Sequence, residues 1–142
     1  MVNRSDKFTL KQKEIERYSD FSTTFEMNPF SGMLARVTNE EAVKQSLKNL
    51  VLTETGERFY DSNKGSKIKQ SLFELFDSGM FDIVKIQLKA SLASYEPRAN
   101  IIDVQLSNDQ LDANALNCKI IFSVINIPGP TFTLDLNVTR VR

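Results

Sequence analysis

The chain has 142 residues, with 18 basic and 18 acidic side chains, a formal net charge of zero and no histidine. This balance gives no support to nucleic acid or an anionic membrane as the main partner. The lack of histidine excludes Ser-His-Asp and Cys-His nucleophilic catalysis, and together with the single cysteine it excludes a structural zinc site. We therefore expect no cofactor and no metal.

The single cysteine, Cys118, has no second cysteine with which to form an internal disulfide, which favours a reducing compartment. The sequence shows neither an apolar run of about eighteen residues nor a signal-peptide pattern. Its length fits one domain.

The N-terminal part changes character at residue 18. Residues 1–17 are polar and charged and predict a flexible arm, whereas residues 18–142 carry the patterns of a single α+β domain. Phe21, Phe25 and Met27 lie in an alternating stretch that predicts a half-buried strand. A turn over 28–32 and a short second strand over 33–37 follow.

Three helices are predicted next. Thr38 and Glu41 have the spacing of a capping box, and the apolar positions of 43–51 fall on one helical face that ends before Gly56. A polar loop over 57–64 leads to a second helix over about 68–76. The third helix runs over about 81–95, and its wide apolar face predicts cover on more than one side. Pro97 ends it.

Three strands close the chain. Ile102, Val104 and Leu106 alternate with polar residues, and apolar residues on both faces of 116–127 predict a central strand. In the last strand, over 131–141, Phe132 begins a strict alternation that predicts one buried and one wet face. The fold class is α+β: a small antiparallel or mixed β-sheet packed against three helices.

No residue cluster calls for catalysis. A carboxylate-only glycosidase needs two acids that face each other, and spacing singles out no such pair among the candidates Glu54, Glu57, Asp61, Glu74, Asp77 and Glu96. Lys64 precedes Gly65, so the glycine loop is not a Walker motif and its glycines are expected to serve turns. Cys118 alternates with aliphatic residues and is expected to be a buried, inert thiol.

The tripeptide Glu96-Pro97-Arg98 is the most informative segment. The helix dipole disfavours Glu96 at a helix C-terminus, and Pro97 biases it toward extended backbone. Residues two apart in an extended segment project to the same side, so Glu96 and Arg98 would present a fixed carboxylate and guanidinium together. That arrangement suits charge-paired docking. The alternative is a helix stop with two solvated charges.

The order of motifs resembles the baseplate wedge family of contractile-tailed phages that is often labelled lysozyme-like, and it is similar to the type VI secretion baseplate subunit TssE. The resemblance covers roughly residues 18–140. It rests on the helix segment 42–47, on 52–58 with Gly56-Glu57-Arg58, on Gly65 before 72–74, and on 95–98 with Glu96-Pro97-Arg98.

The resemblance implies a fold related to the linking domain of the sheath protein. It implies partner docking through Glu96, Pro97 and Arg98, with Gly56, Glu57 and Arg58 as the second motif. The expected partners are the helical core bundle of larger wedge proteins and the tail sheath protein, in a symmetric ring of several copies. The expected location is the virion tail baseplate, after assembly in the host cytoplasm.

The resemblance also implies that the chain templates the sheath. We expect the last strand to receive a sheath strand, with its outward residues Thr131, Thr133, Asp135 and Asn137 facing the sheath. Two alternatives stay open: a peptidoglycan-cleaving lysozyme, which the family label suggests, and a type VI secretion baseplate subunit.

Overall fold

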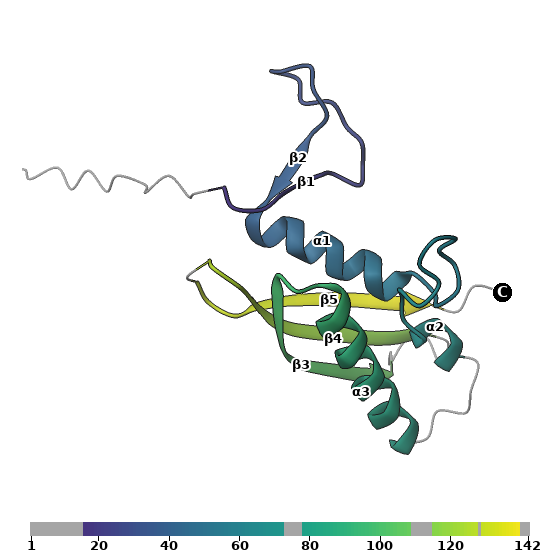
Figure 1. Ribbon diagram of the computed structural model, residues 1–142. Helices are drawn as coiled ribbons and strands as arrows, with labels where there is room; N and C mark the ends of the chain where they lie inside the picture. Colours follow the sequence, from purple (N-terminus) through teal and green to yellow (C-terminus); the bar gives the residue numbers. More distant parts are fainter. Residues whose placement is uncertain (1–15, 73–77, 109–114, 128, 140–142) are drawn as a thin grey trace, which may run out of the picture.

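The computed structural model describes residues 16–72, 78–108, 115–127 and 129–139. Within these ranges the chain forms three helices, a two-stranded sheet and a three-stranded sheet, and all the strand pairs are antiparallel (Figure 1). The predicted α+β class is confirmed. No helix in the described ranges is long and apolar enough to cross a membrane. Of the arm predicted at 1–17, residues 1–15 lie outside the described ranges.

The three-stranded sheet consists of β3 (Ala99–Asn108), β4 (Ala115–Val124) and β5 (Phe132–Thr139), in the order β3-β4-β5. The predicted central strand is therefore confirmed as β4, and β3 and β5 are the edges. One sheet face is buried, with Ile120 and Phe122 fully covered, while Lys119, Thr133 and Asp135 on the other face are exposed. The prediction of one buried and one wet face holds.

The helices α1 (Asn39–Leu52), α2 (Ile68–Ser71) and α3 (Ser78–Tyr95) share one core with the buried face of the sheet. α1 contributes Val43 and Leu47, and α3 contributes Val84, Leu88 and Leu92. α3 ends at Tyr95, two residues before Pro97, as predicted. The predicted second helix is described only to Ser71, because residues 73–77 lie outside the described ranges.

The cover predicted for α3 on more than one side is wrong for the described residues. Ile83 and Ile86 are exposed, while Val84, Leu88 and Leu92 face the core. These three recur at i, i+4 and i+8 and form a single apolar stripe, which is the pattern of a helix packed on one side.

The predicted capping box is also wrong. Thr38 precedes α1 and ends β2, where it pairs with Ser19, but its side chain makes no capping hydrogen bond. Glu41 bonds Lys44 at 2.8 Å instead. Asn39, with a φ of 50°, uses its side-chain oxygen to accept the backbone N–H of Arg17 at 2.9 Å. The start of α1 thus holds the N-terminal segment against the domain.

A β-bulge corrects the predicted register of β3. The pairing with β4 shifts between Ile101 and Asp103, so Ile101 turns into the core and Ile102 becomes exposed. Val104 is buried, as predicted, and Leu106 is half-buried. A bulge inserts one residue and reverses the alternation at that point, which a strict period of two cannot anticipate.

The segment 21–27, predicted as a half-buried strand, is instead part of an exposed hairpin. The strands β1 (Ser19–Phe21) and β2 (Arg36–Thr38) pair at the base of a hairpin, and a bridge joins Met27 to Leu34 farther out. Figure 1 shows the base of this hairpin at the start of α1 and its outer part extending away from the three-stranded sheet. No second layer covers the hairpin within the described part of the chain, so its apolar side chains are exposed.

The glycines of the 53–66 loop serve turns, as predicted. Gly65 is buried at a φ of 150°, and a Cβ at this position would lie 2.8 Å from the carbonyl oxygen of Thr53 and 2.9 Å from that of Glu54. Two independent constraints, the backbone conformation and the close approach of another backbone segment, therefore require glycine here.

We predict that Gly65→Ala lowers the free energy of unfolding by about 1–3 kcal/mol, because it adds a backbone clash to a strained φ. The matched control is Gly79→Ala in α3, where a Cβ meets nothing within 4 Å. Alanine in a helix should leave stability unchanged or raise it by up to about 1 kcal/mol. Urea unfolding of both variants tests this, and equal effects at the two glycines would count against the account.

Candidate partner-docking site

The tripeptide 96–98 forms the turn between α3 and β3. The backbone N–H of Glu96 donates to the carbonyl of Leu92 at 2.9 Å, and the N–H of Ala99 donates to the carbonyl of Glu96 at 3.1 Å. Glu96 is only 3% exposed. The turn therefore carries the Glu96 carboxylate inward, so the alternative of a helix stop with two solvated charges is wrong for Glu96.

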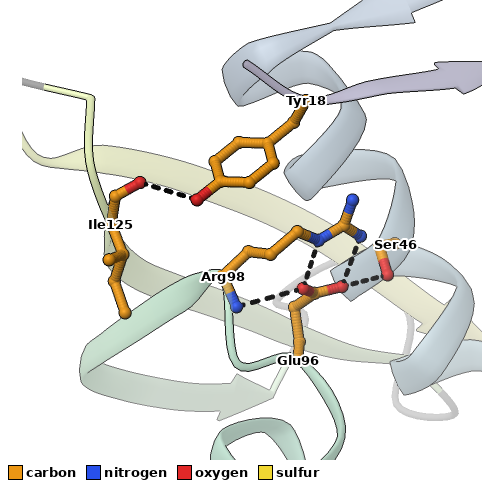
Figure 2. A network of polar contacts seen from close by, with 5 residues as sticks. All are labelled: Tyr18, Ser46, Glu96, Arg98 and Ile125. Carbon is orange, nitrogen blue, oxygen red and sulfur yellow. Dashed lines mark hydrogen bonds and ion pairs between the residues drawn. The ribbon is translucent and has the colours of Figure 1, made fainter.

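The Glu96 carboxylate is bound within its own chain. Arg98 Nε lies 2.6 Å from Glu96 Oε1, Arg98 Nη2 lies 2.8 Å from Oε2, and the Ser46 hydroxyl of α1 donates to the same Oε2 (Figure 2). This is a two-pronged guanidinium–carboxylate pair, which is stronger and more directional than a single contact. The two residues do share one side, as predicted, but they satisfy each other.

Burial alone would raise the pKa of Glu96, since it disfavours the charged form. The hydrogen bonds from Arg98 and Ser46, together with the positive charge of Arg98, outweigh burial and hold the pKa of Glu96 below its ordinary value of 4.5. The carboxylate is therefore ionised at neutral pH and is unsuited to act as a general acid, which needs a raised pKa.

Tyr18 covers the guanidinium of Arg98. Its ring centroid lies 5.7 Å from Arg98 Cζ, at cation–π distance, and its hydroxyl donates to the carbonyl of Ile125 at 3.0 Å. The N–H of Ile125 in turn donates to the carbonyl of Arg98 at 2.9 Å. Figure 2 shows Tyr18, Arg98 and Ile125 meeting at one corner of the domain. Tyr18 is thus a part of the site that no sequence motif indicates, and Ser46 lies in the 42–47 motif without having been predicted as a site residue.

Part of Arg98 stays accessible. Its side chain is 31% exposed, and the pair with Glu96 uses Nε and Nη2. Within the described ranges, no acceptor bonds Nη1. A partner can therefore reach one edge of a guanidinium whose position is already fixed, and that edge offers only N–H donors.

The second motif shapes the loop after α1. The Glu57 carboxylate accepts the backbone N–H of Glu54 at 2.8 Å, and the N–H of Gly56 donates to the carbonyl of Ser62 at 2.7 Å. Arg58 is exposed, and no described residue bonds it. All three residues of the motif are exposed, and Glu57 holds the turn, while Arg58 is the member whose side chain bonds no described residue.

The structure places the two motifs near the same end of α3 without joining them. Ser91 of α3 donates to the carbonyl of Gly65 at 2.7 Å, and Lys64 lies over the Tyr95 ring at 5.9 Å. These contacts anchor the loop beside the residues that precede Glu96. Among the described residues, no hydrogen bond or ion pair joins residues 56–58 to residues 96–98.

The remaining candidates show no catalytic arrangement. Glu54 pairs with Lys69 at 3.8 Å on the surface, and burial raises the pKa of Cys118 to about 12, so this thiol is inert as predicted. Glu74 and Asp77 lie outside the described ranges. The described part of the chain holds no group of three His, Cys, Asp or Glu side chains that could bind a metal.

The family model for baseplate wedge protein gp25 matches residues 37–128, which is most of the chain. This chain belongs to the baseplate wedge protein gp25 family. The predicted family is confirmed, and the role of this family is structural. The matched range includes both motifs and the whole of β4, but it begins after most of the β1–β2 hairpin.

Individual relatives agree with this assignment. The chain is 28% identical over 121 residues to baseplate wedge protein gp25 of Enterobacteria phage T4, which covers 85% of this chain and 90% of the phage protein. Its fold matches a chain in the six-fold symmetrised baseplate of the anti-feeding prophage, with a TM-score of 0.67, 27% identity, and coverage of 78% and 88%. Both relatives come from baseplates, one of a phage and one of the anti-feeding prophage.

Two more distant solved structures share the fold alone. A chain of the type VI secretion baseplate complex matches with a TM-score of 0.61 at 14% identity, covering 72% of this chain and 93% of that one. A presumed tail lysozyme from Geobacter sulfurreducens matches with a TM-score of 0.64 at 21% identity, covering 72% and 92%.

We predict that Arg98→Met lowers the free energy of unfolding at pH 7 by about 3 kcal/mol, because it leaves the Glu96 carboxylate buried without its cation. In the wild type, the stability that this carboxylate contributes is full above its unfolded pKa and is lost as pH falls through its lower folded pKa. In the variant, unpaired burial raises the pKa of Glu96, so stability falls as pH rises.

The difference between wild type and Arg98→Met should therefore be largest at neutral pH and shrink below about pH 4. Denaturant unfolding across this pH range measures it. The control is Lys69→Met, which breaks an exposed pair with Glu54 and should cost within about 1 kcal/mol. A difference for Arg98→Met that does not change with pH would show that Glu96 does not depend on Arg98.

Proposed function

We propose that this chain is a structural subunit of a contractile-tail baseplate that docks on the helical core bundle of larger wedge proteins. The observation that carries the proposal is the exposed edge of Arg98, held in place by Glu96, Ser46 and Tyr18. A cation that is already fixed loses little conformational entropy on binding, which favours its use as a docking contact. The edge offers only donors, so it suits carboxylates or the carbonyl groups at a helix C-terminus.

Within this proposal the docking residues have different tasks. Arg98 and Arg58 reach the partner, and Glu96 and Glu57 hold the two turns. Pro97 fixes the backbone of its turn, and Gly56 allows the φ of 96° in the other. The likeness to a six-fold baseplate supports a ring of several copies. The identities of 28% and 27% to phage and prophage baseplate proteins, against 14% to the type VI chain, favour a virion tail over a secretion system. Assembly in the host cytoplasm is part of the same proposal.

The docking contact can be separated from folding. Arg58→Glu changes an exposed side chain that no described residue bonds, so the free energy of unfolding should stay within about 0.5 kcal/mol of the wild type. Binding to a wedge complex purified without this chain should fall about tenfold or more, as expected when a charge contact is reversed. The control is Lys119→Glu on the outer face of the sheet. Wild-type binding by Arg58→Glu would exclude this loop from the interface.

The proposal also assigns the first template of the sheath to β5. Its edge is free of a neighbouring strand in the described sheet, and Thr133, Asp135 and Asn137 are exposed, as is Thr131 just before the strand. The opposite edge is less open: Lys89 Nζ donates to the carbonyl of Ile102 at 2.8 Å beside the β3 bulge. Bulges and blocked carbonyls oppose strand addition, so β5 is the better edge for an incoming strand.

Proline at Thr133, Asp135 or Asn137 removes one ladder donor without emptying the core. A variant that keeps wild-type stability has lost an outward amide, and it should join the wedge but fail to start a sheath in electron micrographs. Gln105→Pro on β3 is the control and should leave sheath growth normal if it folds. A proline variant of β5 that folds, joins the wedge and starts sheaths normally would contradict a template on this strand.

The alternative of a lysozyme rests on the family label and on a fold match to a presumed tail lysozyme. We predict that the purified protein releases no sugar from peptidoglycan between about pH 4 and 8, because Glu96 is held ionised and no described carboxylate pair is arranged across a cleft. Turnover that disappears when one particular carboxylate is replaced would establish an enzyme instead.

A further inference from the structure

The β1–β2 hairpin concentrates apolar side chains in solvent. Over residues 19–38 six large apolar residues are exposed: Phe21 at 55%, Phe25 at 69%, Met27 at 70%, Phe30 at 98%, Met33 at 72% and Leu34 at 41%. At about 200 Å² for a fully exposed side chain of this size, they present roughly 800 Å² in total. The largest apolar patch of a typical monomer is about 300–600 Å².

This area is what one partner contributes to a stable protein–protein interface, about 800 Å². An isolated two-stranded hairpin is marginally stable in water, and a partner that buries its apolar side chains would stabilise it. The exposed area therefore points to a partner surface of matching size.

Polar contacts at the base and at the tip fix the conformation of the hairpin. At its base, Gln45 of α1 donates to the carbonyl of Phe21 at 2.7 Å and accepts the N–H of Thr23 at 3.2 Å. At its tip, the side chain of Asn28 accepts the N–H of Phe30 at 2.9 Å, and Gly32 turns the chain at a φ of 66°. An ordered tip loses less entropy on binding than a flexible loop does.

Charge and shape decide the kind of partner. The hairpin carries Asp20, Glu26 and Arg36 and no lysine, a net charge of −1, which does not suit an anionic membrane. A second copy of the chain offers a groove of about 330 Å³ between α3 and residues 55–68 and one of about 590 Å³ over β3, β4 and β5. Both volumes are those of small-molecule pockets and do not hold a two-stranded hairpin. Of these three kinds of partner, a different protein chain fits the hairpin best.

We infer that the β1–β2 hairpin is a second docking element, inserted into an aliphatic-lined groove with a neutral or basic rim on a different protein chain of the baseplate. The inference rests on the proposed function, because it names a second contact to the same assembly. The hairpin lies mostly before the residues that the family model matches, so it is distinct from the motif contacts at Arg98 and Arg58.

The test compares two double variants in binding to the wedge complex purified without this chain. Phe30→Ser with Met33→Ser should weaken binding about tenfold or more, as loss of apolar anchors does, and leave the thermal midpoint unchanged. The matched control is Ile83→Ser with Ile86→Ser, which removes residues of 53% and 69% exposure from α3 and should bind like the wild type. Wild-type affinity of the hairpin variant overturns the inference.

A photo-crosslinking phenylalanine analogue at position 30 identifies the occupant. In the assembled wedge it should cross-link to a different baseplate chain; a cross-link to a second copy of this chain overturns the inference. Binding of the wild-type protein to vesicles of phosphatidylcholine and phosphatidylglycerol, abolished by the hairpin variant, overturns it in favour of a membrane.

The same experiments separate this inference from the proposed function. If the wild-type protein does not bind the wedge complex, the proposed function is wrong as well. Binding that Arg58→Glu weakens and the hairpin variant leaves intact defeats only the hairpin inference.

Discussion

The ion pair between Glu96 and Arg98 is the contact on which this corner of the molecule depends. A carboxylate that is 3% exposed would be costly to bury alone, and its partners are the guanidinium and the Ser46 hydroxyl of α1. Through Tyr18 and Ile125 the same contact reaches the N-terminal segment and the end of β4. One pair thus links the α3–β3 turn to elements from three other parts of the chain.

The pair also limits what the motif can do for a partner. Glu96 is already satisfied, so the surface presented at this corner is the remaining edge of Arg98, flanked by the Tyr18 ring. A partner must bring acceptors. The β1–β2 hairpin begins at Ser19, directly after Tyr18, so the Arg98 site and the apolar hairpin are neighbours in the structure. A short charged contact can give specificity, while the larger apolar area supplies affinity.

Sequence patterns predict the helices and strands that pack around the core. They do not predict features that depend on contacts with residues far away in the sequence. The alternation of β5, the central position of β4 and the stop at Pro97 were readable because burial and backbone chemistry act locally. The alternation over 21–27 predicts a half-buried strand, but the segment is exposed. A period of two shows that a strand has two different faces, but not whether another layer packs on either face. The bulge at Ile101 changes the alternation predicted for β3. At the start of α1, the side chain of Asn39 binds the N-terminal segment, where the spacing of Thr38 and Glu41 predicts a capping box. The tripeptide predicts Glu96 and Arg98 on one side, but not that they pair with each other. It also gives no sign of the contacts with Ser46 and Tyr18, which lie 50 or more positions away.

A double-mutant cycle tests most directly whether this pair braces the domain from within. The four proteins are the wild type, Glu96→Gln, Arg98→Met and the double variant, and the measured quantity is the free energy of unfolding at pH 7. Residues in one buried ion pair show coupling energies of about 0.5–3 kcal/mol, and the short two-pronged geometry places the expected value near the upper end, about 2 kcal/mol or more. Effects that add within about 0.3–0.5 kcal/mol would contradict the account, since independent sites behave in that way.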